Sequence, residues 1–262
     1  MTVKVRGLVV RSYEITSSLR YIHILTHENG KLSAGVRGSM TFRGNFKIAV
    51  MPMSYSEFVL HTGKGEKYWI NEATLIQSFF DLSGDYAKLT LGSYVTDVAN
   101  FMSVEGQPDP QLMSLTLNTL WLISKKESVD HHLVKAAFEL RAASIGGFAP
   151  DLECCRDCGA ALGDTNFISV ADGCILCDNC AKKRRFAVPD GRNDVLLKVS
   201  RPTLEAVFYA LYSDPKKIFS FTLDKEFIPE FSKLGEEYLA RQLDYHFPTL
   251  DMLDLSDQEK NC

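Results

Sequence analysis

The sequence contains no long apolar segment of the kind that crosses a membrane. A membrane-spanning helix needs about 20 consecutive apolar residues, and no run in this chain of 262 residues approaches that length. The N-terminus places Lys4 inside its apolar stretch, so it lacks the order of a secretory signal, in which basic residues precede an apolar core. We therefore expect a cytoplasmic protein that makes no membrane contact.

The motifs around which common active sites are built are also missing. The chain has no G-x-x-x-x-G-K-[ST] loop for nucleotide phosphates, no H-E-x-x-H, no H-x-E with P-C-x-x-C, and no G-x-S-x-G. Its six histidines are scattered. We predict that the protein is not an enzyme and has no catalytic residue.

Charge is distributed unevenly along the chain. The net charge is −4, yet residues 1–80 carry ten lysines and arginines against five acidic residues, so the remainder is strongly acidic. A positive face of this kind is compatible with a polyanionic partner, although basic residues also simply solvate a surface.

The first 80 residues show the patterns of short strands. Apolar runs cover residues 3–10, 19–26, 31–37, 55–61 and 67–75, and Asn29-Gly30 between two of them is a strong hairpin signal. In residues 31–37, Leu32, Ala34 and Val36 alternate with polar residues. Gly7 interrupts the first run, where we expect a bulge or a sharp bend. Five short strands without a helical period favour a small closed barrel.

The pattern becomes helical near residue 80. Apolar residues recur at helical spacing over 86–101, 112–123, 129–145, 202–212 and 227–245. We expect Trp121 to be a large core anchor, Gly146-Gly147 to end the third helix, and the acidic residues after Phe247 to fray.

Six of the seven cysteines fall within residues 154–180. Two Cys-x2-Cys pairs, Cys155/Cys158 and Cys177/Cys180, are separated by 18 residues, which is typical of a zinc knuckle with two thiolates on each tight turn. Reduced thiols are normal in the cytoplasm, so a disulfide framework is disfavoured. Four thiolates close the coordination shell, and we therefore predict a structural zinc ion rather than a catalytic one.

Other interpretations of the cysteines stay open. An iron–sulfur cluster also uses four thiolates. Cys174 forms an overlapping Cys-x2-Cys pair with Cys177, which would suit a redox enzyme with a reactive thiol of low pKa, and Cys154 adjoins the first pair. Directly after the cysteines, the run Lys182-Lys183-Arg184-Arg185 is either an anion-binding element or a solvated turn.

Several segments, in this order, resemble the bacterial RecO family of recombination mediators. They are GLVVRS at 7–12, LTHENGKLSA at 25–34, VRG at 36–38, SYVTD at 93–97, FELR at 138–141, GGFAP at 146–150, the two cysteine pairs, LARQL at 239–243 and TL at 249–250. The cysteines match the zinc-bearing branch of that family.

This resemblance implies an α+β multidomain protein: an N-terminal OB-fold β-barrel (residues 1–80), followed by an α-helical domain (81–262) that contains a four-cysteine zinc knuckle (152–185) as an insert. It further implies a nucleoid-associated mediator of DNA repair and recombination that binds single-stranded DNA and anneals complementary strands. The family's partners would be RecR and the C-terminal tail of the single-strand-binding protein, and the role would be to help load recombinase onto strands coated by that protein.

An OB barrel binds single strands with a basic groove and with aromatic side chains on which bases stack. We predict contacts to DNA from the following residues: Arg11, Arg20, Lys31, Arg37, Arg43, Lys47, Lys182, Lys183, Arg184 and Arg185. Tyr21, Phe42 and Phe46 are either stacking residues or barrel core. The alternative function is a non-catalytic scaffold, stapled by zinc, that docks proteins and binds little DNA.

Overall fold

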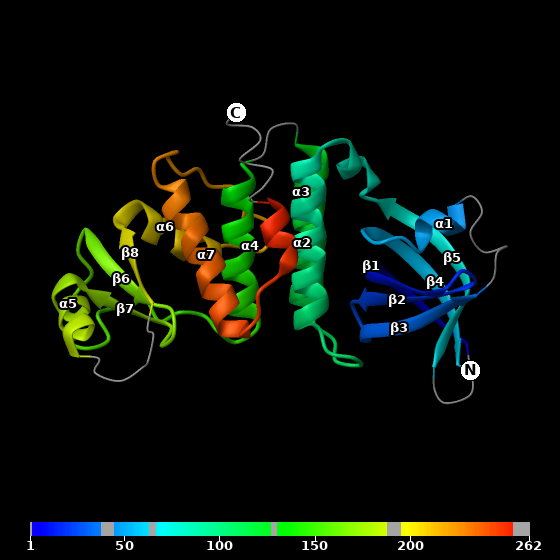
Figure 1. The fold of residues 1–262 in the computed structure, drawn as a ribbon, viewed down its shortest axis with the longest axis horizontal. Helices are drawn as coiled ribbons and strands as arrows, with labels where there is room; N and C mark the ends of the chain where they lie inside the picture. Colours follow the sequence, from blue (N-terminus) through cyan, green and yellow to red (C-terminus); the bar gives the residue numbers. More distant parts are fainter. Residues whose placement is uncertain (1, 38–44, 63–66, 127–129, 188–194, 254–262) are drawn as a thin grey trace. The chain divides into compact units, whose positions relative to one another are not determined.

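The computed structural model describes residues 2–37, 45–62, 67–126, 130–187 and 195–253, without the side chains of 185–187. Its first part is a closed five-stranded barrel, as predicted (Figure 1). The strands are β1 (Thr2–Thr16), β2 (Leu19–Thr26), β3 (Gly30–Arg37), β4 (Ser54–Thr62) and β5 (Tyr68–Ser78), in the order β1-β2-β3-β5-β4 around the barrel. The short helix α1 (Asn45–Ala49) lies between β3 and β4 in the chain.

Alternation along the strands builds the barrel core. Leu32, Ala34 and Val36 of β3 are buried, as their spacing predicts, together with inward residues of the other strands such as Ile22 and Phe58. The Asn-Gly hairpin is confirmed: β2 and β3 pair in register up to Thr26 and Gly30. Gly30 has a φ of 65°, and a Cβ there would lie 2.2 Å from the carbonyl oxygen of Gln107.

Of the bulge or sharp bend expected at Gly7, the bulge is wrong. Gly7 pairs in regular register with Thr26 on one side and Ser56 on the other, and β1 shifts register only between Val9 and Arg11 and again near its end. A Cβ at Gly7 would lie 2.4 Å from the Cγ2 of Ile24. Glycine is therefore required here for the close approach of β2.

Helices occupy the predicted segments. They are α2 (Tyr86–Met102), α3 (Pro110–Lys125), α4 (His131–Ile145), α6 (Arg201–Tyr212) and α7 (Ile228–Leu243), with a short 3-10 helix, η2 (Phe80–Gly84), before α2. Asp85, Asp109 and Asp130 cap α2, α3 and α4, each accepting a hydrogen bond from a backbone N–H of the first turn. None of the helices within the described ranges has both the length and the apolarity needed to cross a membrane.

Two expectations about these segments are wrong. Trp121 is 56% exposed, because it lies on the face of α3 opposite the buried residues such as Leu120 and Ile123. The first residues after Phe247 do not fray: Leu250 and Leu253 are buried, as is Phe247, whose ring lies 5.6 Å from those of Tyr94 and Phe101. Residues 254–262 lie outside the described part of the chain.

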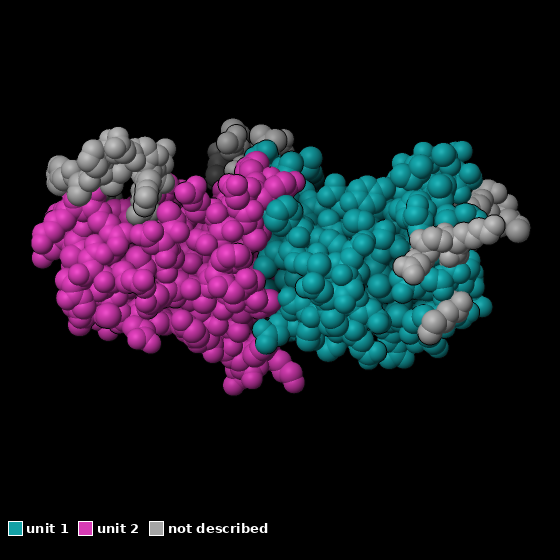
Figure 2. All heavy atoms as spheres, turned by 90° about the horizontal axis from the view of Figure 1, so that it is seen from below, with its two compact units in different colours: residues 1–129, 247–262 teal, residues 130–246 magenta. Residues whose placement is uncertain are grey.

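The cysteine-rich segment folds around a small sheet that sequence patterns did not indicate. Antiparallel strands β6 (Thr165–Ser169), β7 (Cys174–Cys177) and β8 (Leu196–Ser200) lie in the order β7-β6-β8, and helix α5 (Asp178–Ala187) follows β7. The chain divides into two compact units, Met1–Val129 with Phe247–Cys262 and Asp130–His246 (Figure 2). Helices α2 and α3 thus belong to the unit of the barrel, and the six cysteines of residues 154–180 belong to the other.

Candidate metal centre and basic surfaces

The first cysteine pair lies on a tight turn. The backbone N–H of Gly159 donates to the carbonyl of Cys155 at 2.8 Å, and the N–H of Cys155 donates to the carbonyl of Ala160 at 2.9 Å. Gly159 has a φ of 69°, a conformation that favours glycine. The turn therefore presents the sulfur atoms of Cys155 and Cys158 on one side.

The second pair comes from the junction of β7 and α5. Cys177 ends the strand, and Cys180 lies in the first turn of the helix. The backbone N–H of Arg156 donates to the carbonyl of Ile175 at 3.0 Å, and Ile175 in turn donates to Asp151. These bonds hold the first turn against the edge of β7, beside the second pair.

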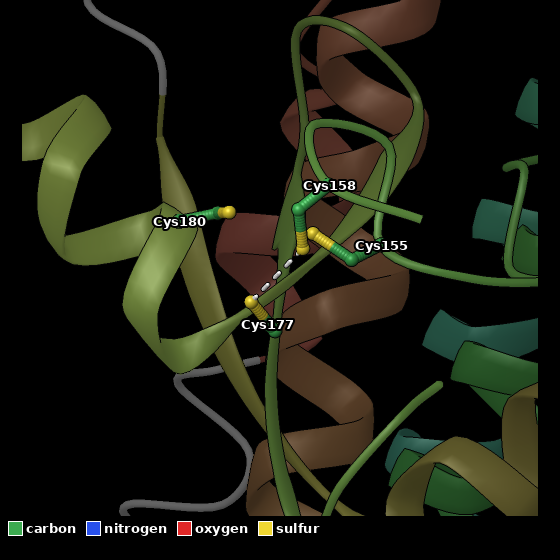
Figure 3. A group of neighbouring side chains, drawn as sticks. All are labelled: Cys155, Cys158, Cys177 and Cys180. Carbon is green, nitrogen blue, oxygen red and sulfur yellow. Dashed lines mark hydrogen bonds between the residues drawn. The ribbon is translucent and has the colours of Figure 1, made fainter. Parts of the chain in front are cut away.

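All four sulfur atoms converge. The sulfur atoms of Cys155, Cys158, Cys177 and Cys180 lie within 4.8 Å of one another, and those of Cys158 and Cys177 are 3.8 Å apart (Figure 3). Zinc–sulfur bonds of ~2.3 Å at tetrahedral angles place sulfur atoms about 3.8 Å apart. The predicted ligand set is therefore brought together with dimensions that fit zinc.

Backbone dipoles support a thiolate at this centre. Burial raises the pKa of Cys155, but backbone N–H groups of Cys177, Cys158 and Asp157 donate to its sulfur and outweigh burial, so that its pKa is lowered to about 6. A metal ligand must be deprotonated, so Cys155 is prepared to bind a metal. Contacts with the other three thiols raise the pKa of Cys180, so the full set of thiolates needs a cation at its centre.

The remaining cysteines in this segment lie outside the cluster. Cys174 is only 2% exposed, and burial raises the pKa of its thiol. A reactive thiol needs the opposite environment, with access to solvent and a lowered pKa. The geometry therefore does not favour the redox interpretation. Cys154 is exposed and is not one of the four converging residues.

On the outer face of the barrel, three strands bring aromatic side chains together. Tyr21 of β2 and Trp69 of β5 both pair with Gly35 of β3, and their rings are 5.9 Å apart. The guanidinium of Arg37 stands 3.5 Å above the ring of Trp69. We call Tyr21, Trp69 and Arg37 the aromatic platform.

The platform depends on a glycine. A Cβ at Gly35 would lie 2.5 Å from the Cζ3 of Trp69, so the indole ring covers the strand because no side chain stands there. Tyr21 and Trp69 are partly buried, and Arg37 is exposed. Sequence reasoning named Tyr21 and Arg37 but missed Trp69, whose outward direction follows from its place beside the inward Ile70.

The other predicted barrel residues are spread over different surroundings. Arg11 lies 5.0 Å from the ring of Tyr13, and Arg20 is 3.7 Å from Glu14. Lys31 donates to the backbone carbonyl of Asn100 in α2, and burial lowers its pKa.

The candidates near α1 are only partly within the described residues. Lys47 is exposed on α1, and Phe46 packs against the barrel core. Phe42 and Arg43 lie outside the described residues.

Sequence reasoning also missed a group of charges on β1 and β4. Glu57 lies 2.7 Å from the ammonium of Lys4 and 3.1 Å from the guanidinium of Arg6, and both cations are well exposed. These side chains line a pocket of about 540 Å³ that also includes His27 and Tyr55. The alternation of Lys4 and Arg6 around the buried Val5 was the available signal.

Helix α5 carries the basic run, and its residues differ in their surroundings. Lys182 pairs with Asp178 at 2.5 Å, and Lys183 is exposed. Arg184 donates to Asp157 at 2.6 Å and 2.8 Å and to Asp172 at 2.5 Å. The side chain of Arg185 lies outside the described part of the chain.

These observations define a class of protein. Its members have a closed barrel followed by helices, and they carry a cluster of four cysteines. Family models agree: "Recombination protein O N terminal" matches residues 1–79 and "Recombination protein O C terminal" matches residues 83–251. The chain belongs to the RecO family of bacterial DNA repair proteins. The domain division at residue 80 stays a prediction.

Curated relatives span the whole chain. It is 29% identical to the DNA repair protein RecO of Acetivibrio thermocellus over 258 residues, which are 98% of each protein. It is 26% identical to that of Alkaliphilus metalliredigens over 93% of this chain and 95% of the relative. Identity to that of Desulforamulus reducens is 27%, over 96% of this chain and 93% of the relative.

Proposed function

We propose that this protein is a non-catalytic recombination mediator that binds single-stranded DNA on the outer face of its barrel, at the aromatic platform. The arrangement of Arg37 above Trp69, with Tyr21 beside it, is the observation that carries the proposal. Binding would move Arg37 from the face of the indole onto a phosphate, and a base of any sequence would take its place on the ring. Strands held this way would be free to pair, with base pairing as the driving force for annealing.

Binding of an oligonucleotide to the platform can be followed by fluorescence. The chain has two tryptophans, Trp69 and Trp121, so a Trp121→Phe variant reports on Trp69 alone. We expect oligo-dT to quench this emission. Trp69→Ala should weaken binding by about 1–3 kcal/mol per lost stacking contact, and Arg37→Gln should reduce the slope of log K against log salt by about 0.7.

Two outcomes separate this proposal from its alternative. Trp69→Phe keeps an aromatic ring and should retain most of the affinity. Unchanged binding by Trp69→Ala, with no quenching in Trp121→Phe, would remove the platform from the proposal. If the purified protein retains no labelled oligonucleotide even at low salt, the protein is instead a docking scaffold.

We also propose that the four-cysteine cluster binds a structural zinc ion. The four thiolates leave no coordination position for water, so zinc would link the turn at Cys155 and Cys158 to the start of α5 without activating substrate. The purified protein should contain one zinc per chain. A strong chelator should release it and unfold residues 152–182, as measured by hydrogen exchange, whereas a metal-free protein with an ordered segment would contradict the proposal.

The proposed partners follow from the family. We propose that the protein works with RecR and with the C-terminal tail of the single-strand-binding protein to load recombinase onto coated strands. Titration of the protein with purified RecR and, separately, with a labelled tail peptide would test this. Absence of binding to both would limit the function to DNA annealing.

A further inference from the structure

Arg184 makes more contacts than a solvated surface cation would. Its guanidinium donates to both carboxylate oxygens of Asp157, at 2.6 Å and 2.8 Å, and to Asp172 at 2.5 Å. Its side chain is only 27% exposed and that of Asp157 is 32% exposed. A bidentate arginine–carboxylate pair is geometrically specific and stronger than an ordinary surface ion pair.

The three residues come from three separate segments of the cysteine-rich region. Asp157 lies between the ligands Cys155 and Cys158, Asp172 lies in the turn between β6 and β7, and Arg184 lies on α5. Arg184 is four residues after Cys180, so both occupy the same face of the helix. The arginine thus reaches the same turn as the metal would.

Charge gives a second reason for this arrangement. Four thiolates around a divalent zinc ion leave a net charge of −2, and Asp157 adds a carboxylate within the same turn. Without Arg184, the Asp157 carboxylate beside this negative centre would lose the cation that both of its oxygens contact. With Arg184 present, Asp157 accepts hydrogen bonds that join the first cysteine turn to α5.

We infer that Arg184 is a positioning residue for the metal centre: its pair with Asp157 holds the two cysteine turns together in parallel with the metal. The side chain of Arg184 is therefore directed toward the protein. Any phosphate contact of the basic run would come from its other cations. The inference rests on the proposed binding of zinc by the cluster. Partners outside the ligand shell typically change metal affinity by about 10–100-fold.

Zinc affinity, measured by competition with a chelator, tests this inference. We expect Arg184→Gln and Asp157→Asn each to lower affinity about 10–100-fold, and Arg184→Lys, which keeps the charge but not the fork, to lie between Arg184→Gln and the unchanged protein. Lys183→Gln, on the adjacent residue, should leave affinity unchanged. Each substitution breaks the link between Arg184 and Asp157, and Arg184→Gln also removes the pair with Asp172. The double variant Arg184→Gln/Asp157→Asn should therefore lose no more affinity than Arg184→Gln alone.

The absorption of the Co²⁺-loaded protein gives a readout that a general loss of stability would not change. We expect the bands of tetrahedral thiolate coordination to shift in Arg184→Gln and to stay the same in Lys183→Gln. Should Arg184→Gln fail to fold, Asp157→Asn tests the same link from the other side. Affinities equal to that of Lys183→Gln, or additive losses in the double variant, would overturn the inference while leaving the zinc proposal intact. A protein that binds no metal at all would overturn both.

Discussion

The ammonium of Lys135 lies 3.3 Å from the carboxylate of Glu139, one turn further along α4, and both side chains are almost completely buried. Glu236 of α7 approaches the same ammonium at 2.6 Å. Burial lowers the pKa of Lys135, but the charges of Glu139 and Glu236 outweigh it and raise the pKa above its ordinary value. The lysine therefore stays charged and joins α4 to α7 in the second compact unit.

Substitution of Lys135 should destabilise this unit strongly. Lys135→Met removes a cation from the fully buried Glu139, and breaking a buried pair in this way costs about 3–5 kcal/mol. Urea unfolding of the metal-loaded protein measures the change. Lys233→Met is the matched control, because it breaks an exposed pair with Glu237 at the same helical spacing and should cost about 0–1 kcal/mol. Equal losses in the two variants would contradict this prediction.

Substitution of Glu57 should strengthen binding to DNA. The carboxylate lies between Lys4 and Arg6 and neutralises both exposed cations. Glu57→Gln releases both cations, so we expect a higher affinity for oligo-dT and a slope against log salt that is steeper by about 0.7 per added phosphate contact. Glu72→Gln, at an exposed acid on β5, is the control for net charge. A gain of the same size in both variants would show that Lys4 and Arg6 make no specific contact.

A methyl group at Gly35 should disturb the aromatic platform. The new Cβ would lie 2.5 Å from the ring of Trp69, so the indole must move away from the strand. We expect Gly35→Ala to cost about 1–3 kcal/mol of stability and to weaken oligonucleotide binding as Trp69→Ala does. Gly84→Ala is the control, because nothing lies within 4 Å of a Cβ there. Full affinity in a folded Gly35→Ala variant would show that the position of the indole does not matter.

The zinc content of cysteine variants should show that Cys174 is not a metal ligand. Cys174 overlaps Cys177 in a Cys-x2-Cys pair but lies outside the cluster of sulfur atoms. Cys174→Ala should therefore keep one zinc per chain, whereas Cys177→Ser should lose most of its zinc affinity. Elemental analysis of the two purified variants decides between them, and loss of zinc from Cys174→Ala would mean that the ligand set is wrong.

Patterns that depend on neighbours in the chain predicted their structures well. Alternation in residues 31–37 and the Asn-Gly turn after β2 were confirmed, since strand direction and turn geometry are local properties. The grouping of the four cysteines into two pairs was likewise predicted from their spacing, because each pair is local in the chain. The predictions for Gly7 and Trp121 were wrong because neighbours in the chain do not decide their environments. The close approach of β2 decides that of Gly7, and the choice of which face of α3 is packed decides that of Trp121.

The amino-acid sequence alone determined the class of protein: a small barrel, a set of helices and four converging thiolates, together with membership in the family. Only the tertiary structure decided what individual cations do. Arg37 stacks on Trp69, which reaches it through the pairing of β3 with β5, and Arg184 pairs with Asp157, 27 residues away in the chain. Spacing along a chain specifies faces and turns, but the partner of a side chain is set by segments that meet only when the chain folds.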